Sequence, residues 1–227
     1  MIIFFHLLFF SATKMVYKNF IWDWNGTIIN DIDLSVSILN KFLTQRGLKN
    51  VSLLEYREIF DFPVKDYYQA VGFNFDKEDF SVIGQQYIET YNSRICETTI
   101  FSDVVETLDF INKNGGKNYI VSARKNSELV KDLEIFNLKK YFVEVCGITD
   151  NLGGGKEFLA EEFKKRHSLS AQDTVFVGDT THDFKISQII GCSCVLVCRG
   201  HQSRKRLESK TKNVIDNFSQ FLDAIKN

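Results

Sequence analysis

The sequence lacks most features that mark membrane, disulfide-rich or nucleic-acid-binding proteins. Its one proline, Pro63, excludes long proline-rich linkers, and its apolar run from Ile2 to Phe10 is far shorter than the roughly 20 residues that span a bilayer. A formal net charge of −1 gives no reason to expect nucleic acid or a membrane surface as a partner. The five cysteines are an odd number, which fits a reducing cytoplasm better than a disulfide framework. We therefore expect a cytoplasmic protein, and we expect it to be a monomer or a homodimer.

Residues 1–14 form an apolar lead that we expect to lie outside the fold. The lead lacks the basic first region of a signal peptide, although Ser11-Ala12-Thr13 resembles a cleavage site. From Met15 onward the chain runs directly into a strand pattern. We favour a misplaced translation start or a disordered lead, with export as the alternative.

Three cysteines near the C-terminus resemble a metal site only at first sight. Cys192, Cys194 and Cys198 precede His201, and Val195-Leu196-Val197 between them indicates a strand. Six residues of strand span about 20 Å, so Cys192 and Cys198 could not share one ion. We interpret these cysteines as small residues of a buried strand.

Short apolar strands alternate with amphipathic helices along most of the 227 residues. The strand patterns lie at 20–22, 118–121, 142–146, 174–177 and 193–197. The helix patterns lie at 34–43, 104–111, 128–136, 157–167 and 184–190, and Ser102 is the expected cap of the second. This alternation predicts an α/β fold with a doubly wound parallel sheet.

One helical stretch interrupts the alternation after the first strand. Residues 30–98 show only helix patterns, separated by Pro63, Gly72 and Gly84. We therefore predict a core made of residues 15–29 and 99–227, with residues 30–98 inserted as a helical cap.

Polar residues capable of chemistry follow the predicted strands. Asp23 and Ser122 end two of them, and Gly178-Asp179 ends a third, with Asp183 close behind. Lys156 stands in a glycine-rich loop at the start of a helix. Ligands bind beyond the carboxyl ends of such strands. Carboxylates suit Mg²⁺, and a hydroxyl with an ammonium suits a phosphate, so the set predicts a metal-assisted phosphoryl site.

These residues resemble the haloacid dehalogenase superfamily, and within it the phosphoglycolate phosphatase-like branch, over residues 16 to 226. Asp23-x-Asn25-Gly26-Thr27 is similar to the first family motif and Ser122 to the second. Lys156 is similar to the third motif, and Gly178-Asp179 to Asp183 to the fourth. The helical insertion stands where this branch places its cap. The proline usually found near the third-motif lysine is absent after Lys156.

The resemblance implies a role for each matching residue. Asp23 would attack phosphorus and form an aspartyl-phosphate. Asp23, Asp179 and the backbone carbonyl of Asn25 would hold Mg²⁺, and Asp183 would support this shell. The phosphoryl group of a small phosphorylated metabolite would be bound by Ser122, Lys156 and Thr27, and the rest of the substrate would contact Phe62 and Lys65 in the cap.

Asn25 departs from the family pattern, which has an aspartate at this place that protonates the leaving oxygen and then activates water. An amide has no carboxyl proton to give and is a poor base. Because positioned acid–base catalysis is worth about 10² to 10⁴ in rate, we expect slow turnover of ordinary phosphomonoesters. Leaving groups that need no proton, such as those of acyl phosphates, should suffer least. His182 or His201 could substitute, although a surface position is the more usual one for a histidine.

Three functions remain open on the sequence alone. The first is a phosphatase or phosphotransferase with weakened acid–base chemistry. The second is an enzyme similar to phosphonoacetaldehyde hydrolase, a family that also lacks the second aspartate and uses a cap lysine as a Schiff base. Lys65 would be that lysine. The third is a phosphate-binding module that has lost turnover.

Overall fold

The computed structural model of this protein describes residues 15–149 and 155–226. The predicted lead at 1–14 lies outside the described residues. Six parallel strands form the central sheet, in the order β5-β4-β1-β6-β7-β8. Their bounds are β1 Asn19–Trp22, β4 Lys117–Lys125, β5 Phe142–Ile148, β6 Thr174–Gly178, β7 Ser193–Val197 and β8 Val214–Ile215. The predicted doubly wound parallel sheet is therefore confirmed.

Alternating side chains on the central strands divide the core between the two faces of the sheet. On β1, Phe20 and Trp22 belong to one buried cluster, whereas Ile21 belongs to another. On the neighbouring β6, Val175 belongs to the first cluster and Phe176 to the second. A strand whose residues are all buried packs against helices on both sides, which explains the continuous apolar runs in the sequence.

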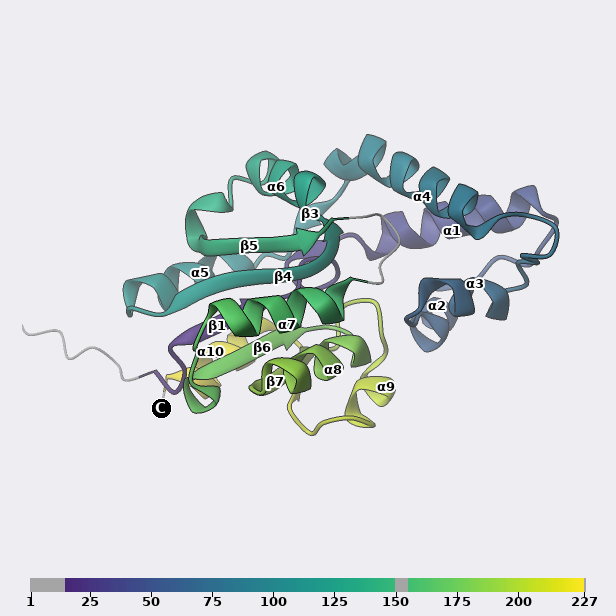
Figure 1. The fold of residues 1–227 in the computed structure, drawn as a ribbon. Helices are drawn as coiled ribbons and strands as arrows, with labels where there is room; N and C mark the ends of the chain where they lie inside the picture. Colours follow the sequence, from purple (N-terminus) through teal and green to yellow (C-terminus); the bar gives the residue numbers. More distant parts are fainter. Residues whose placement is uncertain (1–14, 150–154, 227) are drawn as a thin grey trace, which may run out of the picture.

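Helices cover both faces of the sheet, as Figure 1 shows. The buried leucines and phenylalanines of α5, α6 and α10 join the cluster of Phe20, and α7 and α8 supply Phe163 and Ile186 to the cluster of Ile21. The bounds are α5 Val104–Lys113, α6 Asn126–Ile135, α7 Lys156–Arg166, α8 Thr181–Ile190 and α10 Phe218–Ile225, with the short α9 at Arg204–Glu208. Single 3₁₀ turns lie at Ile95–Glu97, Lys139–Tyr141 and Ala171–Asp173.

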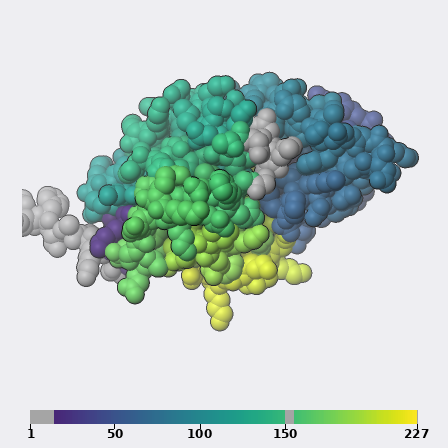
Figure 2. Space-filling model, in the orientation of Figure 1, coloured from purple at the N-terminus to yellow at the C-terminus, as the bar shows by residue number. Residues whose placement is uncertain are grey.

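Four helices follow the first strand and form the cap. Their bounds are α1 Ile32–Gln45, α2 Leu53–Ile59, α3 Val64–Ala70 and α4 Phe80–Arg94. The chain leaves and re-enters the core through two short antiparallel strands, β2 (Ile29–Asn30) and β3 (Thr99–Ile100). The cap lies beyond the carboxyl ends of the sheet in Figure 1 and adjoins the core as a separate lobe in Figure 2.

One predicted helix cap is wrong by a residue. The structure gives Asp103, not Ser102, as the residue that precedes α5. The Asp103 side chain makes no cap bond and instead accepts hydrogen bonds from Arg199 at 2.7 Å and from the backbone N–H of Phe218 at 2.8 Å. Asp103 therefore ties α5 to the start of α10, a contact between segments over 100 residues apart that local sequence does not reveal.

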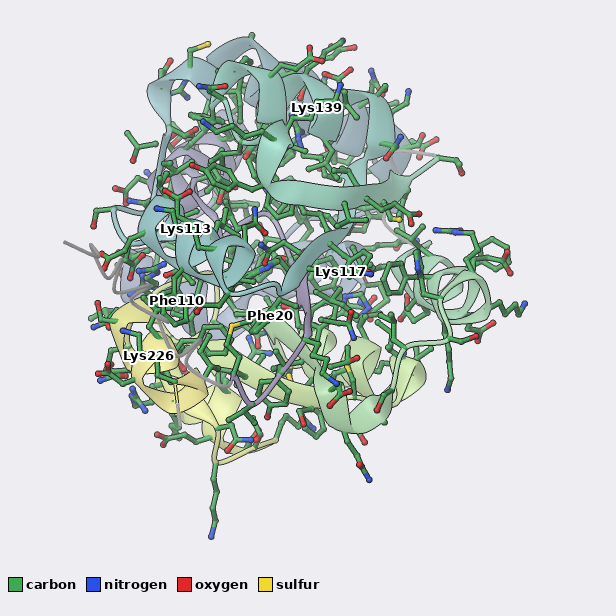
Figure 3. All side chains as sticks on the ribbon, turned by 90° about the vertical axis from the view of Figure 1, so that its left-hand side faces the viewer. Phe20, Phe110, Lys113, Lys117, Lys139 and Lys226 are labelled. Carbon is green, nitrogen blue, oxygen red and sulfur yellow. The ribbon has the colours of Figure 1, made fainter. Side chains whose placement is uncertain are left out.

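The end of the sheet away from the cap carries basic side chains. Figure 3 views this end and labels Lys113, Lys117, Lys139 and Lys226 around the buried Phe20. The Lys226 ammonium lies 5.0 Å from the ring centre of Phe110, so it closes the end of the core by a cation–π contact. Among the described residues, no helix is both long enough and apolar enough to cross a membrane.

Candidate active site

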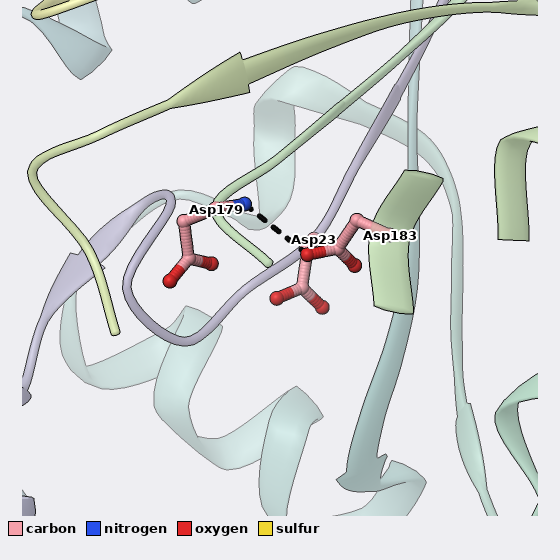
Figure 4. A group of neighbouring side chains, drawn as sticks. All are labelled: Asp23, Asp179 and Asp183. Carbon is pink, nitrogen blue, oxygen red and sulfur yellow. Dashed lines mark hydrogen bonds between the residues drawn. The ribbon is translucent and has the colours of Figure 1, made fainter. Parts of the chain in front are cut away.

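Three buried carboxylates converge at the carboxyl ends of two neighbouring strands. Asp23 follows β1, Asp179 follows β6, and Asp183 lies in the first turn of α8 (Figure 4). One oxygen of each lies within 4.8 Å of the others. The parallel pairing of β1 with β6 brings these aspartates together, although more than 150 residues separate the first from the second. The predicted acidic cluster is therefore present in the structure.

Asp183 is fixed by the turn that begins α8. Its Oδ2 accepts hydrogen bonds from the backbone N–H groups of Asp179 at 3.1 Å and Thr180 at 2.9 Å, and from the Thr180 hydroxyl at 2.6 Å. Figure 4 marks the bond from Asp179. Burial opposes ionisation, but these donors and the nearby Lys156 ammonium hold the pKa of Asp183 below its usual value. Asp183 is therefore a charged, rigid support for its neighbours.

Lys156 bridges two of the carboxylates at the start of α7. Its buried ammonium donates to Asp183 Oδ1 at 2.6 Å and to Asp23 Oδ1 at 2.7 Å. Burial disfavours the charged lysine, yet Asp183 and Asp23 hold its pKa above the usual value. The sequence placed Lys156 in this site, and the structure brings it into direct contact with the predicted nucleophile.

The negative charge of the carboxylate cluster exceeds the positive charge that lies beside it. Burial raises the pKa of Asp23 from its usual 3.8 to about 6 and that of Asp179 to about 7, despite the contact of Lys156 with Asp23. The Lys156 ammonium pairs with Asp23 and Asp183 but not with Asp179, and all the side-chain atoms of the cluster that could bind a metal are oxygens. This donor set and this charge deficit fit a hard divalent cation, which favours carboxylate oxygens.

The raised pKa values predict that stability falls as pH rises when no divalent cation is bound. Between pH 4 and 7 the folded state keeps protons on Asp23 and Asp179 that the unfolded chain has released, so the free energy of unfolding decreases with pH. Each unit of pKa shift corresponds to about 1.4 kcal/mol, which makes the expected loss a few kcal/mol. Asp183 does not reverse this sign, because its lowered pKa places its titration below this range, and the raised pKa of His201, about 9, causes a further loss at higher pH. The lowered pKa of His182 acts in the opposite direction, but it is one group against two.

Urea unfolding in the presence of a chelator at pH 5 and pH 8 measures this effect. We expect the lower free energy of unfolding at pH 8, its recovery on addition of Mg²⁺, and a flatter pH dependence in Asp179→Asn. Equal or greater stability at pH 8 in the chelator would contradict the charge deficit.

Thr27 lies next to the acidic cluster and does not line the cavity, contrary to the expected contact with the phosphoryl group. Its fully buried hydroxyl donates to Asp179 Oδ1 at 2.9 Å, and the backbone N–H of His201 donates to Asp179 Oδ2 at 2.6 Å. Gly26 and Gly200 pack so closely on the Asp179 carboxylate that a Cβ at either place would collide with it. Thr27 therefore positions Asp179.

The side-chain amide of Asn25 binds a fourth carboxylate, that of Asp31. Its Nδ2 donates to Asp31 Oδ2 and lies next to the Tyr91 hydroxyl, both at 2.8 Å. Asp31 also accepts from the backbone N–H of Gly26 at 2.9 Å and from the Tyr91 hydroxyl at 2.9 Å. No local pattern singles out Asp31 as a site residue, because a single aspartate before a helix usually acts as a cap.

Both candidate histidines are buried, so the expected surface positions are wrong. His201 Nε2 lies 3.3 Å from Asp31 Oδ1, and its Nδ1 lies 2.9 Å from the Tyr56 hydroxyl. Burial opposes the charged ring, but Asp31 raises the pKa of His201 to about 9, and the same charge pair keeps the pKa of Asp31 below its usual value. His201 is therefore an imidazolium with both N–H groups engaged at neutral pH, which leaves it no free base.

His182 lies on another side of the site. Its Nε2 is 3.0 Å from Glu157, and its ring packs on Phe62 with the centres 4.6 Å apart. Burial, followed by the charge of Lys156, lowers the pKa of His182. These contacts connect the loop before α3 in the cap to α8 in the core.

A cavity of about 190 Å³ lies between the cap and the acidic cluster. Its core side includes Asp23, Asn25, Ser122 and Lys156, which the sequence assigned to the site. Phe62, the expected substrate contact of the cap, also lines the cavity.

Lys65 does not line this cavity, which corrects the expected contact with the substrate. It is exposed on the cap, with its ammonium 5.6 Å from the ring centre of Phe75. A Schiff-base lysine needs a buried position in the substrate cavity, and the exposed Lys65 does not have one.

Arg124 joins the core to the cap beside this cavity. Its guanidinium donates to Asp132 at 2.5 and 3.0 Å and to Asn92 of α4 at 2.9 Å, and it stacks 4.7 Å from the ring centre of Tyr91. The same Asp132 accepts from the indole N–H of Trp24 at 3.2 Å. Sequence reasoning did not identify Arg124 as a site residue, because its partner Asp132 lies on α6 and reaches Arg124 only when α6 packs on the sheet.

The fold and site define an α/β protein with an inserted cap and an acidic cluster beside a capped cavity. A sequence profile of the haloacid dehalogenase-like hydrolases matches residues 20–197. The chain belongs to this family, as its motifs predicted. Hydrolases of this family generally use a divalent metal, and the acidic cluster is suited to one.

Curated relatives include phosphoglycolate phosphatases. The enzyme of Photobacterium profundum is 25% identical over 132 residues, which cover 57% of this chain and 58% of that protein. The enzyme of Vibrio parahaemolyticus is 20% identical over 239 residues, covering 94% of this chain and 98% of that protein. For three of these relatives, the chain spans only 51% to 58% of their length.

Solved structures share the fold at low sequence identity. A haloacid dehalogenase-like family hydrolase from Streptococcus pneumoniae has a TM-score of 0.77 at 15% identity, covering 92% of this chain and 98% of that one. A structure described as a predicted phosphoglycolate phosphatase from Haemophilus somnus has a TM-score of 0.68 at 20% identity, covering 91% and 97%. At such identities the likeness establishes the fold alone.

Proposed function

We propose that the protein is a magnesium-dependent phosphatase that acts on a small phosphorylated metabolite. The observation that carries the proposal is the buried contact of Lys156 with Asp23 and Asp183, at the edge of a cavity between cap and core. The similarity to phosphoglycolate phosphatases supports the same reaction class. All five cysteines are unpaired thiols, which supports a place in the reducing cytoplasm.

The residues of the cluster have distinct roles in this proposal. Asp23, Asp179 and the backbone carbonyl of Asn25 would hold Mg²⁺, which offsets the charge of the phosphate when bound. An Asp23 oxygen attacks phosphorus, and the bond from phosphorus to the leaving oxygen breaks with its electron pair. Lys156 and Ser122 hold the transferring oxygens, and Lys156 stabilises their charge.

The second half of the reaction has no evident base. Water must attack the phosphorus of the aspartyl-phosphate, and the bond to Asp23 must break. Asn25 cannot take the proton of that water, and both nitrogens of His201 are engaged by Asp31 and Tyr56. Asp31 itself already accepts hydrogen bonds from Asn25, Gly26 and Tyr91. We therefore infer a phosphatase with weakened acid–base catalysis.

Replacing the nucleophile tests the proposal. With Mg²⁺ and a panel of phosphorylated metabolites, the wild type should release phosphate slowly, and Asp23→Asn should reduce this release by at least about 10³-fold. A matched control is Asp223→Asn, which changes an exposed aspartate of α10 away from the site and should retain wild-type release. Removal of Mg²⁺ by a chelator should stop the reaction.

Two results would contradict the proposal. Release that survives in Asp23→Asn would exclude the nucleophile. A wild type that binds inorganic phosphate but releases none from any substrate would support the non-catalytic phosphate-binding alternative.

A further inference from the structure

The cap side of the cavity is a surface of aromatic rings. Eight tyrosine and phenylalanine side chains of the cap line it, including Phe60, Phe62, Tyr67, Tyr68, Phe80 and Tyr87. The lining residues that α2, α3, α4 and the loops joining them contribute carry no charge, within the part of the chain that the structure describes. A ligand group that enters this space therefore meets an apolar, π-rich wall.

Three of the five tyrosines that line the cavity have their hydroxyl groups engaged within the protein. The Tyr87 hydroxyl donates to Ser35 at 3.0 Å, and the Tyr91 hydroxyl donates to Asp31 at 2.9 Å. The Tyr56 hydroxyl lies 2.9 Å from His201. These tyrosines consequently offer a ligand their ring faces and edges more than their polar ends.

The charges on the core side of the cavity do not favour a second anionic group on the substrate. Arg124 is paired with Asp132, Lys156 with Asp23, and the imidazolium of His201, which also lines the cavity, with Asp31. Lys125 also lines the cavity, but the lining includes Glu128, of opposite charge. A carboxylate such as that of phosphoglycolate would therefore be buried against aromatic rings without a dedicated cation, which is costly.

Asn25 points independently to the same leaving group. Without an acid at this position, the leaving oxygen must depart as an anion. An aliphatic alcohol is about as weak an acid as water, whereas a phenol is a much stronger acid, with a pKa of about 10. A phenolate can therefore leave without the proton that Asn25 cannot supply. It also carries an aromatic ring, which suits the lining of the cavity.

We propose that the substrate class is the aryl phosphates, in which the phosphate is esterified to a phenolic oxygen and the ring lies in the cap cavity. This inference rests on the proposed phosphatase function. Apolar cavities of about 150 Å³ bind benzene, so the present space of about 190 Å³ accommodates one substituted ring. In the first step a bond forms between Asp23 and phosphorus, and the phenolate leaves with the electron pair. In the second step water replaces Asp23, giving inorganic phosphate and one proton released to solvent.

Binding of two phosphonates tests the cavity without any turnover. With the full chain and Mg²⁺, calorimetry compares phenylphosphonate with phosphonoacetate, the analogue of phosphoglycolate. We expect phenylphosphonate to bind at least about tenfold more tightly, because aromatic contacts are worth up to about 1.5 kcal/mol beyond their buried area. Equal affinity, or tighter binding of phosphonoacetate, would overturn the aryl preference. Binding of neither would overturn the phosphoryl site and this inference with it.

Turnover separates failure of this inference from failure of the proposed function. For the wild type, kcat/KM on phenyl phosphate should exceed that on phosphoglycolate by at least about 100-fold, the lower range of what a positioned acid supplies. If phosphoglycolate is the better substrate and Asp23→Asn abolishes its hydrolysis, the phosphatase stands and the aryl preference falls. If Asp23→Asn hydrolyses either ester as fast as the wild type, both fall.

A positive charge placed among the aromatic cap residues of the cavity should reverse the order of the two phosphonate affinities. Ile88 of α4 lines the cavity and is half-buried, so a lysine there can reach the space without being sealed in the core. Ile88→Lys should favour phosphonoacetate over phenylphosphonate, whereas Ile88→Met, similar in length but uncharged, should keep phenylphosphonate as the tighter ligand. Thermal melting checks that both variants fold. A folded Ile88→Lys that keeps the wild-type order of affinities would show that the cap wall does not set selectivity.

Discussion

Rapid mixing of the wild type with 4-nitrophenyl phosphate and Mg²⁺ should release about one nitrophenolate per active site in a burst, followed by slow steady release. The nitrophenolate leaves without a proton, so formation of the Asp23 phosphoryl ester does not need the missing acid. Hydrolysis of that ester needs an activated water, and Asn25 offers no base for it. The second step should therefore be slower than in a site with a carboxylate at position 25 by about 10² to 10⁴.

Stopped-flow absorbance measures this burst directly. Its amplitude should follow protein concentration, and Asp23→Asn should show no burst. The slow phase should have nearly the same kcat for several aryl phosphates, because all of them pass through the same aspartyl-phosphate. Linear release from the first turnover would contradict the assignment of ester hydrolysis as the slow step.

Restoring a carboxylate at position 25 should raise turnover of alkyl phosphates fully only when Asp31 is changed as well. Asn25 Nδ2 lies 2.8 Å from Asp31 Oδ2, so an aspartate in its place would set two buried carboxyl groups within hydrogen-bond distance. Such a pair shares one proton, because both cannot ionise at that separation. The new carboxyl group of Asn25→Asp therefore keeps the shared proton. It can act as an acid, but the neighbouring charge of Asp31 prevents it from acting as a base.

The exchange variant Asn25→Asp with Asp31→Asn keeps one carboxylate and one amide in the pair. We expect it to hydrolyse phosphoglycolate or glycerol phosphate about 10² to 10⁴ faster than the wild type, with Asn25→Asp alone falling between them. Asp31→Asn alone should give no gain, which controls for the loss of the Asp31 charge beside His201. If Asn25→Asp alone matched the exchange variant, Asp31 would not restrain this position.

The sequence predicted the parts of the site that follow from strand order. Asp23 and Asp179 directly follow apolar strands, and Ser122 follows the apolar run of β4, which continues to Lys125. A parallel sheet brings such positions to one edge. Lys156 was predicted from the third family motif, and Asp183 was predicted from the fourth. These inferences needed only local patterns and one topological rule.

The remaining part of the site depends on contacts that no local pattern encodes. Asp31 and His201 are 170 positions apart, and they meet only because the chain returns to the sheet edge after β7. Thr27 was expected to bind phosphate, yet the tight turn at Gly26 directs its hydroxyl to Asp179. Lys65 was expected in the cavity, but the helix that carries it presents Tyr67 and Tyr68 there. Helix periodicity predicts that a face is buried but does not reveal which cavity it lines.

The aromatic cap side of the cavity indicates a substrate class for this chain that membership of the family alone does not. Its relatives include phosphoglycolate phosphatases, and its own cap lining is mostly aromatic and uncharged across α2 to α4 within the described residues. The same fold can carry different specificities when the cap changes, because cap and core meet at the cavity. In the proposed reaction, Asn25 and the cap rings favour the same substrates, because an aryl leaving group does not need a general acid.

A crystal structure with Mg²⁺ and beryllium fluoride, a mimic of the phosphoryl group, tests the central arrangement most directly. We predict one metal ion bound by Asp23, Asp179 and the carbonyl oxygen of Asn25, with the fluoride adduct on an Asp23 oxygen and in contact with Lys156 and Ser122. A crystal grown under these conditions in which Asp23 carries no adduct and no ion lies between Asp23 and Asp179 would contradict the account.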